Sequence, residues 1–73
     1  MDHSIYGYLT RRSTDELHFS FYSYLQQDDF RFYEHICVMC QEILKTRLSP
    51  ADPLLSEYGI ALEKRRKDFY QDI

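Results

Sequence analysis

The spacing of apolar side chains along the chain predicts three helices. The run Ser-Thr-Asp-Glu at residues 13–16 fits a capping box, in which Ser13 accepts from the amide of Glu16 and the Glu16 carboxylate reaches back to the Ser13 amide. At about 100° per residue, one face of the helix that follows is apolar. Its members are Leu17, His18, Phe21, Tyr24 and Leu25. We therefore expect a first helix over 13–27 that buries this face.

A second apolar stripe follows, out of phase with the first. Asp28 and Asp29 supply an N-cap and negative charge at a helix start. The stripe consists of Tyr33, Ile36, Cys37, Cys40, Ile43 and Leu44. Its centre, near Cys40, would lie about 100° around an unbroken helix from Phe21, which favours a break and a second helix over 29–48. One continuous helix over 13–48 remains the alternative, since no Gly or Pro separates the two parts and supercoiling absorbs some drift.

Two prolines separate a third helix from the second. Asp52 is a suitable N-cap, and Pro53 fits the first position of a helix over 53–70, where a missing amide does no harm. The stripe of this helix contains Leu55, Tyr58, Leu62, Phe69 and Ile73. Arg65 and Arg66 interrupt it, with stems that can lie along the edge of the core. Gly59 on the same side allows a close helix crossing, marks a kink or is simply tolerated.

Residues 1–12 differ from the rest of the chain in the pattern of their apolar and aromatic residues. Ile5, Tyr6, Tyr8 and Leu9 surround Gly7, and aromatic residues are typical of extended chain. We expect an extended arm here that packs across the helices. Residues 1–73 then form a single all-α domain, a small three-helix bundle made of an antiparallel helix hairpin, a third helix and an extended N-terminal segment.

The composition agrees with a small helical domain. The 73 residues include only two Gly and two Pro and are 44% hydrophobic, which argues against disorder and against β-rich folds that need many turns. No apolar run approaches the roughly 18 residues of a membrane span, and residues 1–12 lack the pattern of a signal peptide. We therefore expect a cytoplasmic protein that does not engage membranes.

The chain offers little catalytic chemistry. Cys37 and Cys40 form a Cys-x-x-Cys pair, a spacing found in zinc sites and in redox centres. The histidines, His3, His18 and His35, lack the paired spacing of zinc ligands, and the cysteines fall inside a predicted helix rather than at its start. Packing of reduced cysteines in the core is the favoured interpretation, ahead of a metal or redox role. We predict no enzymatic activity, no cofactor and no metal.

The charge balance disfavours nucleic-acid binding. Nine basic and twelve acidic side chains give a net charge of −3, whereas duplex-binding domains carry a basic face. Two basic clusters are present, and their members are Arg11, Arg12, Lys64, Arg65, Arg66 and Lys67. If the clusters met in space, they would form a basic patch for an acidic partner. A small nucleic-acid-associated accessory protein is therefore the alternative function, although we expect nucleic acid to be the less favoured partner.

Aromatic content points to an interaction surface. Phenylalanine and tyrosine make up 16% of the chain, and Phe19 points away from the predicted core. Apolar residues on the other two helices do the same, and together with the aromatic N-terminal segment they would form one interface patch. Its expected members are Phe19, Tyr22, Val38, Ile60, Tyr6 and Tyr8. We predict a non-enzymatic protein–protein interaction or regulatory module, bound to a protein partner or self-associating as a homodimer.

The segment from Tyr8 to Leu17, which reads Tyr-Leu-Thr-Arg-Arg-Ser-Thr-Asp-Glu-Leu, includes the capping box. It resembles the openings of short, uncharacterised helical proteins of Gram-positive gut bacteria and their mobile elements. The resemblance implies a bacterial cytosolic setting and an accessory role. It brings no activity and no site residue to carry over.

Overall fold

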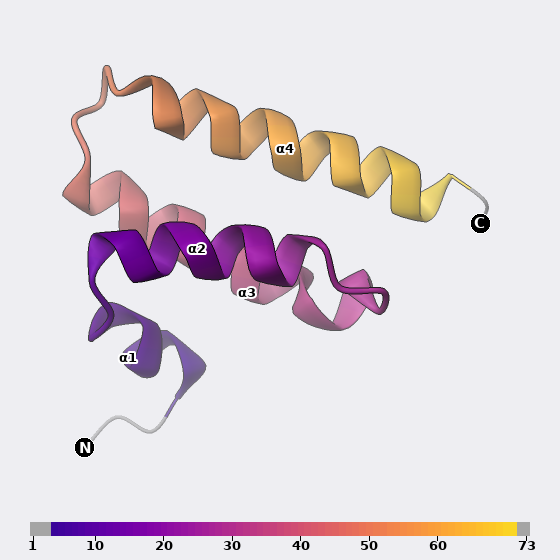
Figure 1. Cartoon of the computed structure of the whole chain (residues 1–73), viewed down its shortest axis with the longest axis horizontal. Coiled ribbons are helices and arrows are strands. Elements are labelled where there is room, and N and C mark those ends of the chain that lie inside the picture. Colours follow the sequence, from indigo (N-terminus) through magenta and orange to yellow (C-terminus); the bar gives the residue numbers. More distant parts are fainter. Residues whose placement is uncertain (1–3, 72–73) are drawn as a thin grey trace.

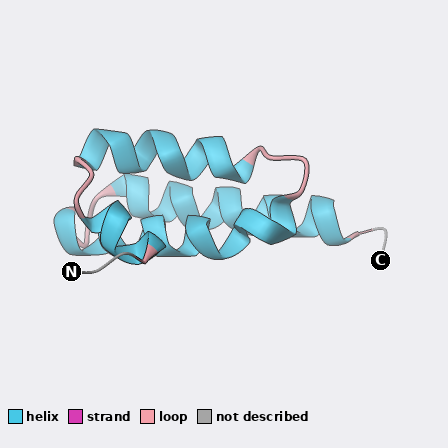
Figure 2. Ribbon diagram, turned by 90° about the horizontal axis from the view of Figure 1, so that it is seen from below, coloured by secondary structure: helices cyan, strands magenta, loops and turns pink. Residues whose placement is uncertain are grey.

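The computed structural model describes residues 4–71 as four helices joined by short loops (Figure 1). In chain order these helices are α1 (Ile5–Thr10), α2 (Thr14–Leu25), α3 (Phe30–Arg47) and α4 (Pro53–Tyr70). Within these residues every regular element is a helix, so the fold is all-α as the apolar periodicity predicts (Figure 2). The predicted stripe position Ile73 and residues 1–3 of the predicted arm lie outside the described residues.

The capping box that starts α2 is confirmed. The Ser13 hydroxyl accepts from the Glu16 amide at 3.1 Å, and the Glu16 carboxylate accepts from the Ser13 amide at 3.0 Å. The helix ends at Leu25, two residues before the predicted end. Arg65 of α4 donates to the carbonyl oxygens of Leu25 at 2.8 Å and Gln27 at 2.9 Å. A long-range contact therefore satisfies backbone groups that α2 leaves open at its C-terminal end.

A loop separates α2 from α3, so the alternative of one continuous helix over 13–48 is wrong. Asp29 occupies the N-cap position of α3, but its side chain makes no capping hydrogen bond, contrary to the prediction for Asp28 and Asp29. Leu25 on one side of the loop and Phe30 on the other are both buried. The break brings both side chains into the core, which an unbroken helix with out-of-phase stripes would not allow.

Helix α3 is the centre of the molecule. It contacts α1, α2 and α4, and it runs antiparallel to α2 (Figure 1). The core that these contacts enclose contains Leu9, Leu17, Phe21, Leu25, Phe30, Ile36, Cys37, Cys40, Ile43, Leu44, Tyr58 and Leu62. Several predicted stripe positions lie at its edge rather than inside it, and these are His18, Tyr24, Tyr33, Leu55 and Phe69. The predicted apolar faces thus point to the core, with their flanking members partly exposed.

The predicted extended arm is wrong over the described residues, because Ile5–Thr10 forms the helix α1. Ser4 caps it by accepting from the Gly7 amide at 3.0 Å, and Leu9 is fully buried. At the other end, Arg47 of α3 donates to the carbonyl oxygens of Thr10 at 2.8 Å and Arg12 at 2.5 Å. Local capping and tertiary contacts outweigh the extended preference of the tyrosines.

Helix α4 begins as predicted, with Pro53 in its first turn and the Asp52 carboxylate accepting from the Leu54 amide at 2.9 Å. The helix continues unbroken through Gly59 to Tyr70. A Cβ added at Gly59 would meet only the side-chain nitrogen of Gln41, at an ordinary contact distance of 3.8 Å. Gly59 is therefore neither a close crossing point nor a helix break, and the tolerated glycine is the interpretation that the structure supports.

Candidate functional site

The residues predicted to form one interface patch are divided over the molecule. Tyr8 and Phe19 line a common hollow on α1 and α2, whereas Ile60 lines a hollow on α4 and Val38 one between α3 and α4. Tyr22 is partly buried, with its ring against His18, Phe21 and Tyr58. Tyr6 is about half exposed on α1 and is not among the residues of the three hollows. The six residues therefore do not line one common hollow, and of them Tyr8 and Phe19 share one.

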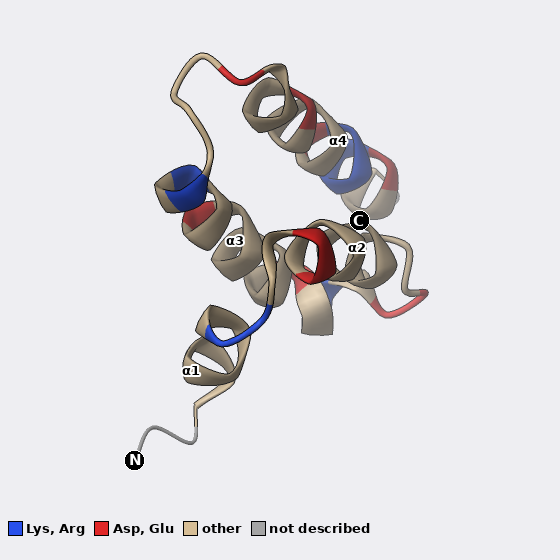
Figure 3. Cartoon of the chain, turned by 60° about the vertical axis from the view of Figure 1, so that its left-hand side comes forward, with Lys and Arg blue, Asp and Glu red and all other residues tan. Residues whose placement is uncertain are grey.

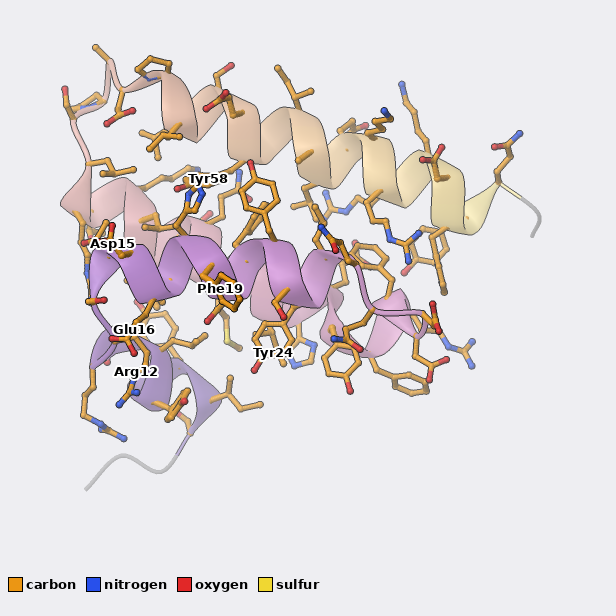
Figure 4. All side chains as sticks on the ribbon, in the orientation of Figure 1. Arg12, Asp15, Glu16, Phe19, Tyr24 and Tyr58 are labelled. Carbon is orange, nitrogen blue, oxygen red and sulfur yellow. The ribbon has the colours of Figure 1, made fainter. Side chains whose placement is uncertain are left out.

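We call the hollow on α1 and α2, with its lining residues, the aromatic surface. It has a volume of about 310 Å³ and is lined by Tyr8, Arg12, Asp15, Glu16, Phe19 and Ser20. Phe19 is 74% exposed and projects from α2 in Figure 4, with Arg12 and Glu16 beneath it. Because Phe19 is two positions from the buried Phe21, the two rings point in nearly opposite directions around the helix.

The charged side chains of the aromatic surface hold one another in place. The Arg12 guanidinium lies over the Tyr8 ring, 4.7 Å from its centroid, and its Nη1 is 3.5 Å from Glu16 Oε2. The capping hydrogen bonds with Ser13 lower the pKa of the Glu16 carboxyl, and Arg12 lowers it further. Arg12 Nε is buried without a hydrogen-bond partner among the described residues. One donor at the edge of the aromatic surface therefore remains unpaired there.

Both signs of charge are present around the aromatic surface. Figure 3 shows the basic loop of Arg11 and Arg12 leading into the acidic first turn of α2, which contains Asp15 and Glu16. Neither Arg11 nor Asp15 makes an ion pair with another described residue. The lining itself carries Arg12 against Asp15 and Glu16, and Arg11 precedes Arg12 in the loop.

The two basic clusters do not meet. Arg11 and Arg12 precede the N-terminus of α2, whereas Arg65 reaches its C-terminal end, on the order of 18 Å away for a 12-residue helix. Arg66 is also engaged, because its Nε lies 2.5 Å from Glu34 Oε2. Lys64 and Lys67 of the second cluster line the hollow on α4, together with Ser56, Gly59, Ile60 and Glu63. The continuous basic patch that the sequence suggested is not formed.

Cys37 and Cys40 are fully buried, in agreement with the core-packing interpretation. Burial raises the pKa of the Cys37 thiol to about 12 and that of Cys40 to about 11. Both thiols are therefore protonated near neutral pH, and the Cys37 thiol faces the Phe21 carbonyl oxygen at 3.7 Å. Within residues 4–71 no cluster of three or more His, Cys, Asp or Glu side chains is arranged to hold a metal ion.

A histidine–tyrosine pair joins α2 to α4, and sequence reasoning missed it. His18 Nδ1 lies 2.6 Å from the Tyr58 hydroxyl, and burial raises the pKa of that phenol, which keeps it protonated near neutral pH. Both residues lie on the predicted apolar faces, and a polar tip on such a face needs a partner. The sequence therefore indicates that each of these side chains has a polar partner. It does not indicate that the two bind each other, because they are 40 positions apart.

A third hollow of about 470 Å³ lies between α3 and α4 and is lined by Arg31, Glu34, His35, Val38, Met39 and Arg66. The Glu34 carboxylate links α3 to α4, because it accepts hydrogen bonds from Arg66 and, at 2.6 Å, from the Tyr70 hydroxyl. The hydrogen bond from Tyr70 and the contact with Arg66 lower the pKa of Glu34 against an opposing effect of burial.

The helices of residues 4–71 include none with the length and apolar character needed to cross a membrane. The chain matches no model of a known protein family, no curated protein and no solved structure. Its function is therefore inferred from the geometry of its own surface.

Proposed function

We propose that the protein is a non-enzymatic protein-interaction module that docks to its partner through the aromatic surface. The observation that carries this proposal is the exposure of Phe19 in the middle of the helix α2, next to the half-exposed Tyr8. Full burial of a phenylalanine side chain is worth about 1.5 to 3 kcal/mol. Aromatic residues are also enriched at the centres of protein interfaces.

The ordered rim supports docking. The ring contact and the ion pair of Arg12 restrict Tyr8, Arg12 and Glu16 before a partner arrives. Side chains that are already ordered lose less conformational entropy on binding, which favours association. The hollow thus combines exposed apolar area with the polar groups of Arg12 and Glu16, which are restricted by their contacts with each other and with the Tyr8 ring.

The same groups do not favour catalysis. The lining contains no His, Cys or Lys, and a carboxylate such as Glu16, with its pKa lowered below the ordinary range, is a weak general base near neutral pH. The nucleic-acid alternative has less support than interaction with protein, because Arg11 and Arg12 are separated from the cations of α4. We place the module in the bacterial cytoplasm, a setting in which two free buried cysteines are usual.

Affinity capture with the intact chain as bait tests this proposal. The baits are the wild type, Phe19→Glu and the control Ile60→Glu, which places the same charge at an apolar residue of similar exposure on α4. We expect wild type and Ile60→Glu to retain the same proteins and Phe19→Glu to lose them. Circular dichroism of each bait verifies that it is folded. Equal retention by all three baits, or none by the wild type, would overturn the proposal.

A further inference from the structure

An arginine of the chain already occupies one part of the aromatic surface. The Arg12 guanidinium lies 4.7 Å from the centroid of the Tyr8 ring, and its Nη1 is 3.5 Å from Glu16 Oε2. A guanidinium is planar and delocalised, so it can stack on a ring while it pairs with a carboxylate. Tyr8 and Glu16 together therefore suit an arginine, and the chain supplies that arginine itself.

Phe19 and Asp15 bring a second ring and a second carboxylate to the same hollow (Figure 4). They are four positions apart in α2, so their side chains are neighbours on the helix surface. Both are exposed, and no described residue forms an ion pair with Asp15 or places a cation over the Phe19 ring. A partner that supplies a guanidinium can therefore repeat here the contact that Arg12 makes with Tyr8 and Glu16.

The charge of the hollow favours a cationic partner. Its lining carries Arg12 against Asp15 and Glu16, and Arg11 lies outside that lining. The linings of the other two hollows each carry two lysine or arginine side chains against one carboxylate, so the aromatic surface differs from both in sign. The net charge of −3 also attracts cationic groups at longer range. Phosphate groups and acidic segments are repelled by the same carboxylates.

The exposed rings add an apolar requirement to the cationic one. A free cation would leave the apolar area of Phe19 and Tyr8 in water, whereas an apolar side chain beside the arginine covers it. The hollow offers about 310 Å³ for such a side chain. We propose that the aromatic surface binds an arginine-bearing segment of a partner protein, with the guanidinium between Asp15 and Phe19 and an adjacent apolar side chain in the hollow. This inference rests on the proposed function and names the chemistry of the partner.

Selection from a random heptapeptide library displayed on phage tests the inference without assuming a partner sequence. The targets are the folded wild-type chain and, for counter-selection, Asp15→Lys. We expect peptides with an arginine next to an apolar residue to be enriched on the wild type and lost on the variant. Enrichment of acidic or uncharged peptides, or no enrichment at all, would overturn the inference.

Titration of the most enriched peptide against matched variants assigns the contact. We expect Asp15→Asn and Phe19→Ala each to weaken binding by about tenfold or more. The controls Asp68→Asn and Ile60→Ala make the same changes on α4 and should leave binding unchanged. Replacing the peptide arginine with uncharged citrulline should weaken binding to the wild type and have little further effect on Asp15→Asn, because the two groups act as one pair. Equal weakening by Asp15→Asn and Asp68→Asn would mean attraction by net charge alone and would overturn the contact.

Affinity capture keeps the inference distinct from the proposed function. A protein that wild type and Asp15→Lys retain equally, and that Phe19→Glu loses, would leave the proposed function standing and overturn the arginine contact. Self-association of the purified chain that depends on Phe19 and not on Asp15, measured by light scattering, would assign the surface to a second copy and overturn the inference. If Phe19→Ala fails to fold by circular dichroism, Asp15→Asn and its control Asp68→Asn decide, because both aspartates are exposed.

Discussion

Phe19 and Phe21 are two residues apart on α2 and lie in opposite environments. Phe21 is fully buried between α3 and α4, whereas Phe19 faces away from both. The helix period alone requires this difference, because positions i and i+2 are separated by about 160° around the axis. The exposure of Phe19 is therefore a consequence of burying Phe21, and Tyr8 of α1 lines the same hollow.

Arginines act at the residue scale as caps for helices that are distant in sequence. Arg47 donates to the end of α1 and Arg65 to the end of α2, while the Arg65 guanidinium also lies 5.3 Å from the Phe30 ring centroid. Positive charge near a helix C-terminus is favoured by the helix dipole. The guanidinium groups of both arginines are therefore engaged in hydrogen bonds within the fold.

The buried cysteines lead to a prediction about reactivity and stability. Because both thiols are buried and their pKa values are raised, we expect them to react with a thiol reagent far more slowly in the folded chain than in denaturant. Cys40→Ser should lower the free energy of unfolding by about 1 to 3 kcal/mol, since it buries a poorly satisfied hydroxyl. Urea unfolding measures this change. Addition of a chelator should leave the melting temperature unchanged, and stoichiometric zinc in the purified protein would contradict the prediction.

At the scale of elements, the starts of α1, α2 and α4 have local caps, whereas distant partners contact the ends of α1 and α2. Ser4, Ser13 and Asp52 each accept from an amide two or three residues ahead in their own helix. The C-terminal ends of α1 and α2 depend on arginines of α3 and α4 instead. Sequence patterns of a few residues predict the local caps at helix starts. They contain no information on the distant arginines that contact the helix ends.

Gly59 provides a prediction at this scale. Alanine has a higher helix propensity than glycine by about 1 kcal/mol, and an added Cβ at Gly59 meets only Gln41 at 3.8 Å. We therefore expect Gly59→Ala to raise the free energy of unfolding by about 0.5 to 1 kcal/mol in chemical denaturation. The control Ala61→Gly on the same helix should lower it by a similar amount or more. A loss of stability in Gly59→Ala would mean that α3 and α4 approach more closely than described.

On the scale of the whole molecule, the described chain is flat, with extents of 38 × 32 × 14 Å. A shape this thin leaves the outward faces of its helices uncovered, which explains why large apolar side chains remain exposed on all four helices, including Phe32 on α3. Helix α4 is held by Tyr58 and Leu62 in the core and by polar contacts to α2 and α3. Among these contacts, the one with Glu34 is expected to make the attachment of α4 sensitive to acidification.

Glu34 links the stability of the α3–α4 pair to acidification. Its pKa in the folded chain is lowered below the ordinary value of 4.5, mainly by the hydrogen bond from Tyr70. A carboxyl with a lowered pKa contributes stability above its ordinary pKa and loses it as the pH falls through the folded value. We therefore expect Glu34→Gln to be less stable than wild type at pH 7, with a difference that shrinks as the pH falls below about 4.5.

Thermal unfolding between pH 7 and pH 3 measures this difference. Tyr70→Phe removes the phenolic donor and should reduce the same pH dependence, while its ring keeps the contact with Phe69. A stability difference between wild type and Glu34→Gln that is constant over this range would contradict the assigned role of Glu34.

The sequence by itself determined the all-α class, the start of α2 at its capping box, the start of α4 at Asp52 and Pro53, and the faces of the helices that point to the core. Each depends on residues three or four positions apart, the distance over which caps and the helix period act. Helix α1 depends on both local and distant contacts, because Ser4 caps its start locally and Arg47 donates to its end. Tertiary structure alone decided which arginines become caps, and that Tyr8 and Phe19 share a hollow while Ile60 and Val38 lie elsewhere. These outcomes depend on contacts such as those of Arg47 and Arg65, which span 35 to 40 positions. A local pattern has no means of specifying which surfaces such contacts bring together.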